Sequence, residues 1–282
     1  MYLSKHQGGN TVSTADRVDP NEAKRWKRDV LEAYLGVTLK RLFATGPDAF
    51  DEIYQRLRQF SDSLPATEAG EVKSVDGPNA LPQSILETVT SLAYAIDAKD
   101  QYTQGHSQKV SAYAALLAEA IGMGEAEVEE IRLGAVLHDV GKVGIPEQIL
   151  NKNGPLNPEE WETMKTHVTY GGRLLEPLRP LARIRKMVLH HHEFFDGSGY
   201  PEALSGKIIP LGARIITIAD SYDTITSDRS YKKGRTAEQA LSELERCAGT
   251  QFDPALVEAF VRTMRQLPNP IIEVATLLTR NT

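Results

Sequence analysis

Residues 133–146 read LGAVLHDVGKVGIP, and this stretch places two polar side chains directly behind an apolar run. Leu133–Leu137 is apolar enough to lie in a core, so it carries the adjacent His138 and Asp139 toward the interior. A buried carboxylate needs a partner, and a metal ion is a natural one. Because an adjacent His-Asp pair also occurs by chance in many proteins, the stretch gains meaning only together with the rest of the chain.

Five of the seven histidines and two aspartates fall in segments that each have the character of part of a metal site. Asp220 ends the run RIITIAD (residues 214–220), whose apolar residues favour a buried carboxylate over a simple charge at a helix end. Five imidazoles and two carboxylates are about what two divalent ions sharing a bridging carboxylate require. These candidate ligands are His106, His138, Asp139, His167, His191, His192 and Asp220.

The chain outside these segments divides by composition into four parts. Residues 1–20 are polar and predict a flexible tail, and residues 65–80 predict a polar linker that precedes the main domain at 81–282. Between them, apolar residues recur at helical spacing over 21–64, with a break at Thr45-Gly46-Pro47. This pattern predicts a helical hairpin, which would serve dimerisation or signal input, or else simply pack against the main domain.

The main domain is predicted to be all-α, and three of its helices have recognisable starts. Asn157 followed by Pro158 and Glu160, and Thr236 followed by Gln239, are typical of capping boxes. Asp253 before a proline is typical of a cap with proline at the first helical position. The β-branched run at 214–220 is locally ambiguous, and we interpret it as a buried helix because no partner strands are evident.

Composition excludes several classes of protein. The formal net charge is −6, whereas a nucleic-acid-binding protein usually has a basic excess, so no DNA partner is expected. No apolar run approaches the roughly 20 residues that a membrane span needs, and the first 20 residues lack the apolar core of a signal peptide. The single cysteine, Cys247, suits a reducing compartment, so a cytoplasmic location is expected.

The motifs taken together make the chain similar to a known family. From Asp100 to Phe260, a little over half the chain, the sequence resembles the HD-GYP family almost motif for motif. The first eighty residues have no counterpart in this resemblance. The segments that carry it include YTQGHS (102–107), LHDVGKVGIP (137–146), ILNKNG (149–154), HHEFFDGSGYP (191–201), RSYK (229–232) and QFDP (251–254), together with His167 and Asp220.

The resemblance implies an HD-type helical bundle with a central binuclear metal site. By position, His106, His138, Asp139 and Asp220 would hold one ion, and Asp139 would bridge to a second ion held by His167, His191 and His192. In the family a metal-bridging hydroxide attacks a phosphodiester bond of cyclic di-GMP and gives linear pGpG. The family implies iron or manganese in preference to zinc or nickel, all of which suit imidazole and carboxylate ligands.

The resemblance also assigns roles around the metals. Lys142 lies four residues after His138, so on a helix both would share a face, and it would stabilise charge on the phosphate or protonate the leaving oxygen. Arg229 and Lys232 match positions that contact the nucleotide. Tyr200 would stack on a guanine or instead cap the core. Glu193 would orient His191 or His192 from behind.

Other residues near these motifs carry weaker expectations. The loop Gly199-Tyr200-Pro201 is a candidate contact for a signalling partner. Arg214 and Asp223 are expected to form ion pairs that order their segment, and His190 to face solvent or support a ligand. Some relatives carry a Glu four residues before the first ligand histidine, which supports a third metal. This chain has Tyr102 there, which predicts two metals and slow onward cleavage to GMP.

Three alternatives stay open from the sequence. A simpler HD phosphohydrolase would hold one metal, but His167 and the His191-His192 pair supply ligands for a second. A catalytically weak module that binds cyclic dinucleotides would be expected to lack a ligand, and the two-metal set is complete. A hybrid cyclic GMP-AMP substrate cannot be separated from cyclic di-GMP by sequence.

Overall fold

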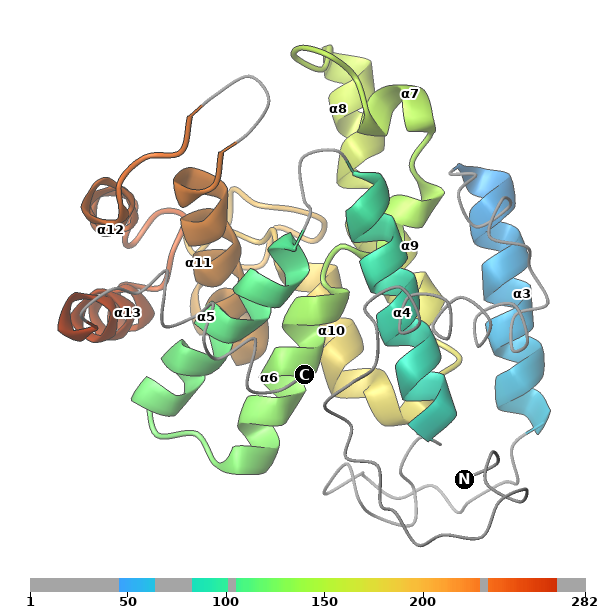
Figure 1. Cartoon of the computed structure of the whole chain (residues 1–282), viewed down its shortest axis with the longest axis horizontal. Helices are drawn as coiled ribbons and strands as arrows, with labels where there is room; N and C mark the ends of the chain where they lie inside the picture. The colour runs from blue at the N-terminus through green and yellow to red at the C-terminus, as the bar shows by residue number, and fades with distance from the viewer. Residues whose placement is uncertain (1–45, 64–82, 101–104, 229–232, 268–282) are drawn as a thin grey trace, which may run out of the picture.

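The computed structural model describes residues 46–63, 83–100, 105–228 and 233–267 (Figure 1). Its helices are, in chain order, α3 (Pro47–Ser63), α4 (Gln83–Lys99), α5 (His106–Ala120), α6 (Glu125–Leu137), η1 (Val140–Gly144), α7 (Glu147–Leu150), α8 (Pro158–Lys165), α9 (His167–Leu175), η2 (Arg179–Leu181), α10 (Ala182–His190), η3 (Gly206–Ile208), α11 (Leu211–Thr226), α12 (Ala237–Arg246) and α13 (Pro254–Gln266). In these ranges β structure is limited to one isolated bridge, Ala248 to Phe252. The all-α prediction is confirmed, and none of the described helices is long and apolar enough to cross a bilayer.

The three helix starts that the sequence predicts are all present. Asn157 Oδ1 accepts a hydrogen bond from the Glu160 backbone N at 2.8 Å at the start of α8, and the Glu160 carboxylate accepts one from the Asn157 backbone N. Thr236 caps α12 through the Gln239 backbone N, and Asp253 caps α13. Each cap satisfies backbone donors that a helix end leaves without partners, which is why local sequence suffices to place it.

The run at 214–220 is helical, as predicted, because α11 is buried on nearly every side. Ile215, Ile216 and Ile218 are fully buried, and the helix packs against α5, α6 and α10. Its Thr217 hydroxyl donates to the carbonyl oxygen of residue 213 at 2.8 Å and to that of His191 at 2.6 Å. Tertiary burial outweighs the strand preference of β-branched residues here, and it fixes α11 against the end of α10.

Two hydrophobic clusters form the core, and two helices take part in both. One cluster joins α5, α11, α12 and α13, and the other joins α3, α4, η1 and α9. Helix α6 contributes Ile131 to the first cluster and Leu137 to the second, and α10 contributes Met187 to the first and Val188 to the second. In Figure 1 these two helices lie between the two groups. The residues that directly follow α6 and α10 in the chain therefore lie where the two hydrophobic clusters meet.

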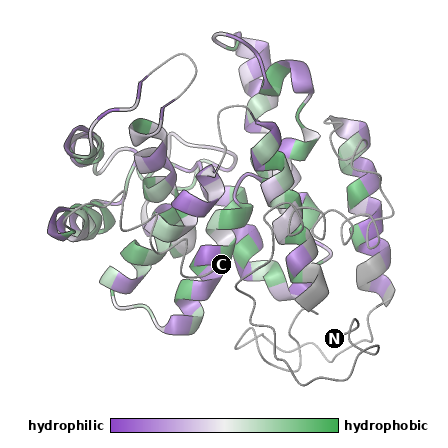
Figure 2. Ribbon diagram, viewed as in Figure 1, coloured by the Kyte–Doolittle hydropathy of each residue, from purple (hydrophilic) through white to green (hydrophobic). Residues whose placement is uncertain are grey.

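Helix α3 packs its apolar face against this domain. Phe50, Ile53 and Leu57 are at most 4% exposed, and the Phe50 ring lies 4.6 Å from the Tyr170 ring of α9. Apolar and polar bands alternate along α3 in Figure 2, as expected for an amphipathic helix. This favours the packing role for α3, because its apolar face is used within the chain. Three predicted segments lie outside the described residues: the tail at 1–20, the first half of the hairpin before residue 46, and the linker at 65–80.

Segment η1 approaches α9 so closely that no side chain fits at Gly141. A Cβ atom there would lie 1.9 Å from the His167 carbonyl oxygen and 2.3 Å from the Gly171 nitrogen. Both are backbone atoms, which cannot rotate out of the way. The glycine thus sets the distance between η1 and the start of α9.

Gly141→Ala is expected to destabilise the fold by about 3 kcal/mol, the upper part of the range for overpacking, and to displace His167. Thermal unfolding monitored by circular dichroism measures this loss. Gly124→Ala is the matched control, since its Cβ would meet nothing nearer than 3.8 Å, and loss of a glycine N-cap should cost at most about 1 kcal/mol. Equal unfolding temperatures for the two variants would contradict the tight contact.

Candidate metal centre

The structure brings together side chains from five segments of the chain. His106 begins α5, His138 and Asp139 follow α6, His167 begins α9, His191 and His192 follow α10, and Asp220 lies within α11. Their ligand atoms form three overlapping groups, within each of which all atoms lie within 4.8 Å of one another. The groups are His167, His191 and His192; His106, His138 and Asp220; and His138, Asp139 and His191. Every residue predicted as a ligand belongs to at least one group.

Three of the histidines lie just after a helical turn, and this position orients their rings. In each, Nδ1 lies within hydrogen-bond distance of the carbonyl oxygen three residues earlier, which the preceding turn presents. An imidazole that donates from Nδ1 to a carbonyl keeps its Nε2 lone pair free to bind a metal. The pairs are His138 with Ala135 at 2.7 Å, His167 with Met164 at 2.8 Å, and His191 with Val188 at 2.8 Å.

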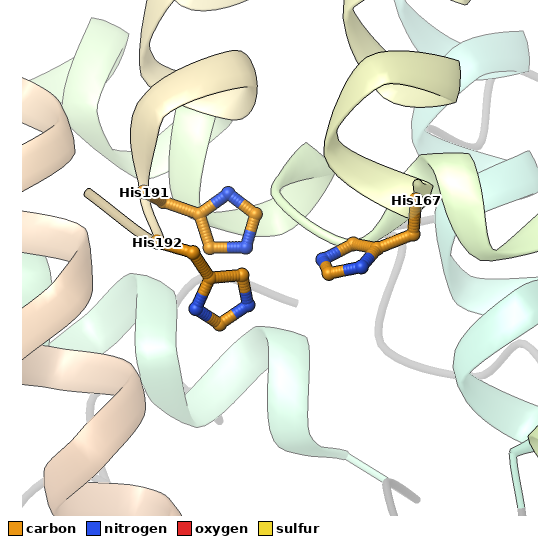
Figure 3. A group of neighbouring side chains, drawn as sticks. All are labelled: His167, His191 and His192. Atoms are coloured by element: carbon orange, nitrogen blue, oxygen red, sulfur yellow. The ribbon is translucent and has the colours of Figure 1, made fainter. Parts of the chain in front are cut away.

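The Nε2 atoms of His167 and His191 are buried, and neither has a hydrogen-bond partner within the described part of the chain. A buried polar atom without a partner is costly, so its presence calls for an explanation. In Figure 3 the rings of His167, His191 and His192 turn toward one another from two separate segments. A transition-metal ion fits this arrangement, because converging imidazole nitrogens are ligands that such ions prefer.

Asp139 lies between the histidine groups. Its Oδ2 is 3.3 Å from Nε2 of His138, and its Oδ1 is 3.4 Å from Nε2 of His167. The two oxygens of one carboxylate therefore face histidines of two different groups. This is the placement that a bridging ligand needs.

Burial keeps the histidines of the group formed by His167, His191 and His192 neutral. It lowers the pKa of His167, holds the pKa of His191 well below its usual range, and lowers the pKa of His192 to about 3, with neighbouring imidazoles adding to the effect. Neutral imidazole is the form that binds metal. These rings are thus in the protonation state that a metal site requires at neutral pH.

His106 has the opposite electrostatic environment. Burial acts to lower its pKa, but Asp220 and Asp223 outweigh burial and raise the pKa to about 10. The same neighbourhood holds the pKa of Asp220 below its usual range despite burial, because His106 hydrogen-bonds to it. Two carboxylates thus stabilise positive charge at this ring, whether a proton or a metal ion provides it.

Lys142 is placed differently from the prediction. Helix α6 ends at Leu137, and Lys142 lies in the 3₁₀ helix η1, so it does not share an α-helical face with His138. In 3₁₀ geometry residues three apart line up, which brings Lys142 beside Asp139. Its Nζ lies 2.8 Å from Oδ2 of Asp139 and 2.8 Å from Oδ2 of Asp100. Although burial acts to lower it, the two carboxylates raise the pKa of Lys142, so the amine stays protonated.

Glu193 does not orient His191 or His192, contrary to the prediction. Its two carboxylate oxygens accept hydrogen bonds from the backbone N of Glu202 at 2.7 Å and of Leu204 at 3.0 Å. Glu193 is 2% exposed, and these bonds hold the following loop in place. His190 is buried rather than solvent-facing, with Nδ1 3.6 Å from Oε1 of Glu193.

The loop after His192 folds back over the centre. The Tyr200 backbone N donates to the His192 carbonyl oxygen at 3.1 Å, and the Tyr200 ring stacks on the His192 ring with centroids 5.0 Å apart. A side chain on Gly199 would collide with the backbone of this segment, where the His192 carbonyl oxygen lies 2.5 Å from the Cβ position. The Tyr200 ring therefore lies at the edge of the histidine cluster, with one face already covered.

Two aspartates in this region were not predicted to serve the site. Asp223 lies 2.7 Å from Nδ1 of His106, and Asp100 pairs with Lys142. The spacing of Asp220 and Asp223 could have indicated the first, because residues three apart share a helix face. Arg214 pairs with Asp253, as expected of a structural residue. Tyr102, Arg229 and Lys232 lie outside the described residues.

Comparison with known families and proteins agrees with this geometry. The sequence profile of a family described as HD domain matches residues 90–256, which is more than half of the chain. The matched residues include all seven candidate ligands, and α3 lies before the first matched residue.

Three curated relatives are similar over this region. A cyclic di-GMP phosphodiesterase of Thermotoga maritima is 39% identical, over 65% of this chain and 50% of the relative. The cyclic di-GMP phosphodiesterase response regulator RpfG of Xanthomonas campestris is 38% identical, over 75% of this chain and 57% of the relative. The 3'3'-cGAMP-specific phosphodiesterase 2 of Vibrio cholerae is 43% identical, over 63% of this chain and 34% of the relative. The matches thus span between a third and three fifths of these relatives' lengths.

Two solved structures share the fold. The cyclic GMP-AMP-specific phosphodiesterase V-cGAP3 of V. cholerae superposes with a TM-score of 0.54 at 23% identity, over 69% of this chain and 52% of that one. Bd1817 of Bdellovibrio bacteriovorus, described as an HDG"Y"P protein, superposes with a TM-score of 0.52 at 18% identity, over 87% of this chain and 80% of that one. With the motifs, the helical bundle and the converging histidines in agreement, this chain belongs to the HD-domain family and to its HD-GYP group.

Proposed function

We propose that this chain is a metal-dependent phosphodiesterase that hydrolyses cyclic di-GMP to linear pGpG. The observation that carries the proposal is the convergence of five histidines, Asp220 and Asp139, and the two oxygens of Asp139 face different histidine groups. The similarity to curated cyclic di-GMP phosphodiesterases supports the choice of substrate.

In the proposed centre, His106, His138 and Asp220 hold one divalent ion, His167, His191 and His192 hold a second, and Asp139 serves both. Iron or manganese is favoured, and zinc or nickel also suits this donor set. Such ions, when bound, supply Lewis-acid stabilisation of the phosphate and activation of water.

The remaining residues bind and polarise the substrate. Lys142 offers a buried ammonium group beside Asp139, where it stabilises charge on the phosphate and can donate a proton to the leaving oxygen. Tyr200, whose ring stacks on His192 and has Lys165 Nζ 5.7 Å from its centroid, is proposed to stack on a guanine base. Arg229 and Lys232 are proposed to contact the nucleotide, and the loop at Gly199–Pro201 to contact a signalling partner.

A hybrid cyclic GMP-AMP dinucleotide is the second candidate substrate, because one relative of that specificity is 43% identical. The two substrates differ in one base only, so the metal centre and Lys142 would act on both in the same way. Discrimination would lie with residues that contact the base edge.

The test is a direct assay of the purified chain loaded with Mn²⁺ or Fe²⁺. Cyclic di-GMP and 3'3'-cGAMP are incubated separately, and the products are separated by chromatography while bound metal is measured. We expect two ions per chain, faster loss of cyclic di-GMP than of the hybrid, accumulation of pGpG, and no turnover after chelation.

A chain that binds two ions but leaves both dinucleotides intact would contradict the proposal. Equilibrium dialysis with cyclic di-GMP would then decide whether the chain is a binding module. Faster turnover of 3'3'-cGAMP would keep the reaction class and change the substrate.

A further inference from the structure

Four histidines of the centre have a hydrogen-bond partner at Nδ1, and these partners are not all of the same kind. His138, His167 and His191 each face a backbone carbonyl three residues earlier. His106 instead faces a carboxylate that lies 117 residues away in the chain, with Nδ1 2.7 Å from Oδ2 of Asp223. This bond has no role in the function proposed so far.

The difference follows from where His106 lies in its helix. It is the first residue of α5, and Gly105 before it has a φ of 75°, so α5 itself has no carbonyl three residues before the ring. A partner for Nδ1 has to come from another element, and α11 provides it.

Two carboxylates of helix α11 contact the His106 ring, one at each ring nitrogen. Asp220 and Asp223 are three residues apart and share a face of the helix. Oδ1 of Asp220 lies 3.2 Å from Nε2 of His106, and Oδ2 of Asp223 approaches Nδ1 on the other side of the ring. The geometry assigns the two aspartates different places: Asp220 is next to the metal-binding nitrogen, and Asp223 is behind the ring.

Asp223 is itself held rigidly. Its side chain is 3% exposed, and its other oxygen, Oδ1, accepts a hydrogen bond from the Ser227 hydroxyl at 3.0 Å. Lys109 of α5 lies 3.7 Å from that oxygen and donates to the Ser227 hydroxyl at 3.1 Å. A carboxylate fixed at both oxygens can determine the orientation of a ring, because it cannot follow the ring when it turns.

We propose that Asp223 is a positioning residue that holds the His106 ring with Nδ1–H toward itself and strengthens metal binding in the group formed by His106, His138 and Asp220. This inference rests on the proposed metal centre and names a residue beyond the ligand set. A carboxylate behind a ligand histidine fixes its tautomer and raises the basicity of the other nitrogen. His167 and His191 of the other group have backbone carbonyls beside Nδ1 rather than carboxylates, so the effect is specific to the ion held with His106.

The test measures Mn²⁺ bound per chain at increasing chelator concentration for the wild type, Asp223→Ala and Asp223→Asn. Losing such a carboxylate should weaken one ion about 10- to 100-fold and leave the other unchanged. The Asn variant keeps the shape and guards against misfolding of the Ala variant. Asp253→Asn is the matched control, because Asp253 is also buried and also pairs with a residue of α11, Arg214, but lies in none of the metal groups.

A double-mutant cycle with His106→Ala separates positioning from general support of the fold. If Asp223 acts through His106, Asp223→Asn should have no further effect on bound Mn²⁺ once His106 is removed. Equal losses with and without His106, or wild-type metal affinity in both Asp223 variants, would overturn the inference. Neither outcome depends on cyclic di-GMP, so failure of the proposed substrate would be recognised separately in the hydrolysis assay.

Discussion

Asp139→Ala is expected to lower the rate of cyclic di-GMP hydrolysis by at least about 10³-fold. Metal ions contribute several kcal/mol of charge stabilisation, and each ~1.4 kcal/mol corresponds to a tenfold change in rate. No other candidate ligand has its two oxygens facing histidines of two different groups. Its loss should therefore weaken both ions, whereas loss of any other ligand should weaken one.

Comparing the metal bound by Asp139→Ala with that bound by Asp220→Ala tests whether Asp139 serves both ions. Asp220 belongs only to the group that contains His106 and His138. Bound metal measured by mass spectrometry should therefore fall from two ions toward one in Asp220→Ala and below one in Asp139→Ala. The shared role of Asp139 would be refuted if both variants retained the same amount of metal, or if Asp139→Ala hydrolysed cyclic di-GMP at the wild-type rate.

Local chemistry made parts of the fold predictable. Caps such as Asn157 and Thr236 depend on residues within one turn, so the sequence places those helix starts without knowledge of the fold. The run before Asp220 was harder, because its β-branched residues favour strands and only burial between helices makes it helical. Its apolar composition still indicated correctly that the run is buried.

The candidate ligands could be predicted as a set because metal chemistry restricts the residue types. Their supporting partners could not, since these depend on which backbone groups lie nearby in three dimensions. Glu193 is adjacent to the ligand pair in sequence but bonds to the loop at Glu202 and Leu204. Asp223 is far from His106 in sequence and contacts it directly. Proximity to the ligand pair in sequence was misleading for Glu193. For Asp223 the signal in the sequence is its spacing of three residues from Asp220, which places both on one helix face.

The position of Lys142 was predicted correctly near the ligands but for the wrong geometric reason. Two glycines in η1 allow a close approach to α9, where Gly141 meets backbone and Gly144 meets the Tyr170 ring. The segment after Asp139 is a 3₁₀ helix, in which Lys142 lines up with Asp139. An α-helical extrapolation from His138 cannot anticipate such a tertiary contact.

Lys142→Met is expected to lower kcat by about 10²–10³-fold while leaving two bound ions, the magnitude found when one preorganised charge-stabilising group is removed. The Lys142 side chain is 15% exposed and lies between Asp139 and Asp100. A charge held in such a site is preorganised toward the phosphate and needs no rearrangement during the reaction. Methionine removes the ammonium group and keeps an unbranched apolar side chain that is one atom shorter, with sulfur in place of Cδ.

Removal of Lys142 also takes away the ammonium group that lies between Asp139 and Asp100, and breaking a buried ion pair destabilises a protein by about 3–5 kcal/mol. Asp100→Asn combined with Lys142→Met removes one of the two carboxylate charges and should recover stability without recovering kcat. Lys152→Met is the matched control, because Lys152 pairs with Glu160 in a neighbouring segment and its side chain is 33% exposed. If the double variant regained wild-type turnover, Lys142 would act only by neutralising its neighbours, and its proposed part in the reaction would be wrong. If stability returns while kcat stays low, the ammonium group acts on the substrate.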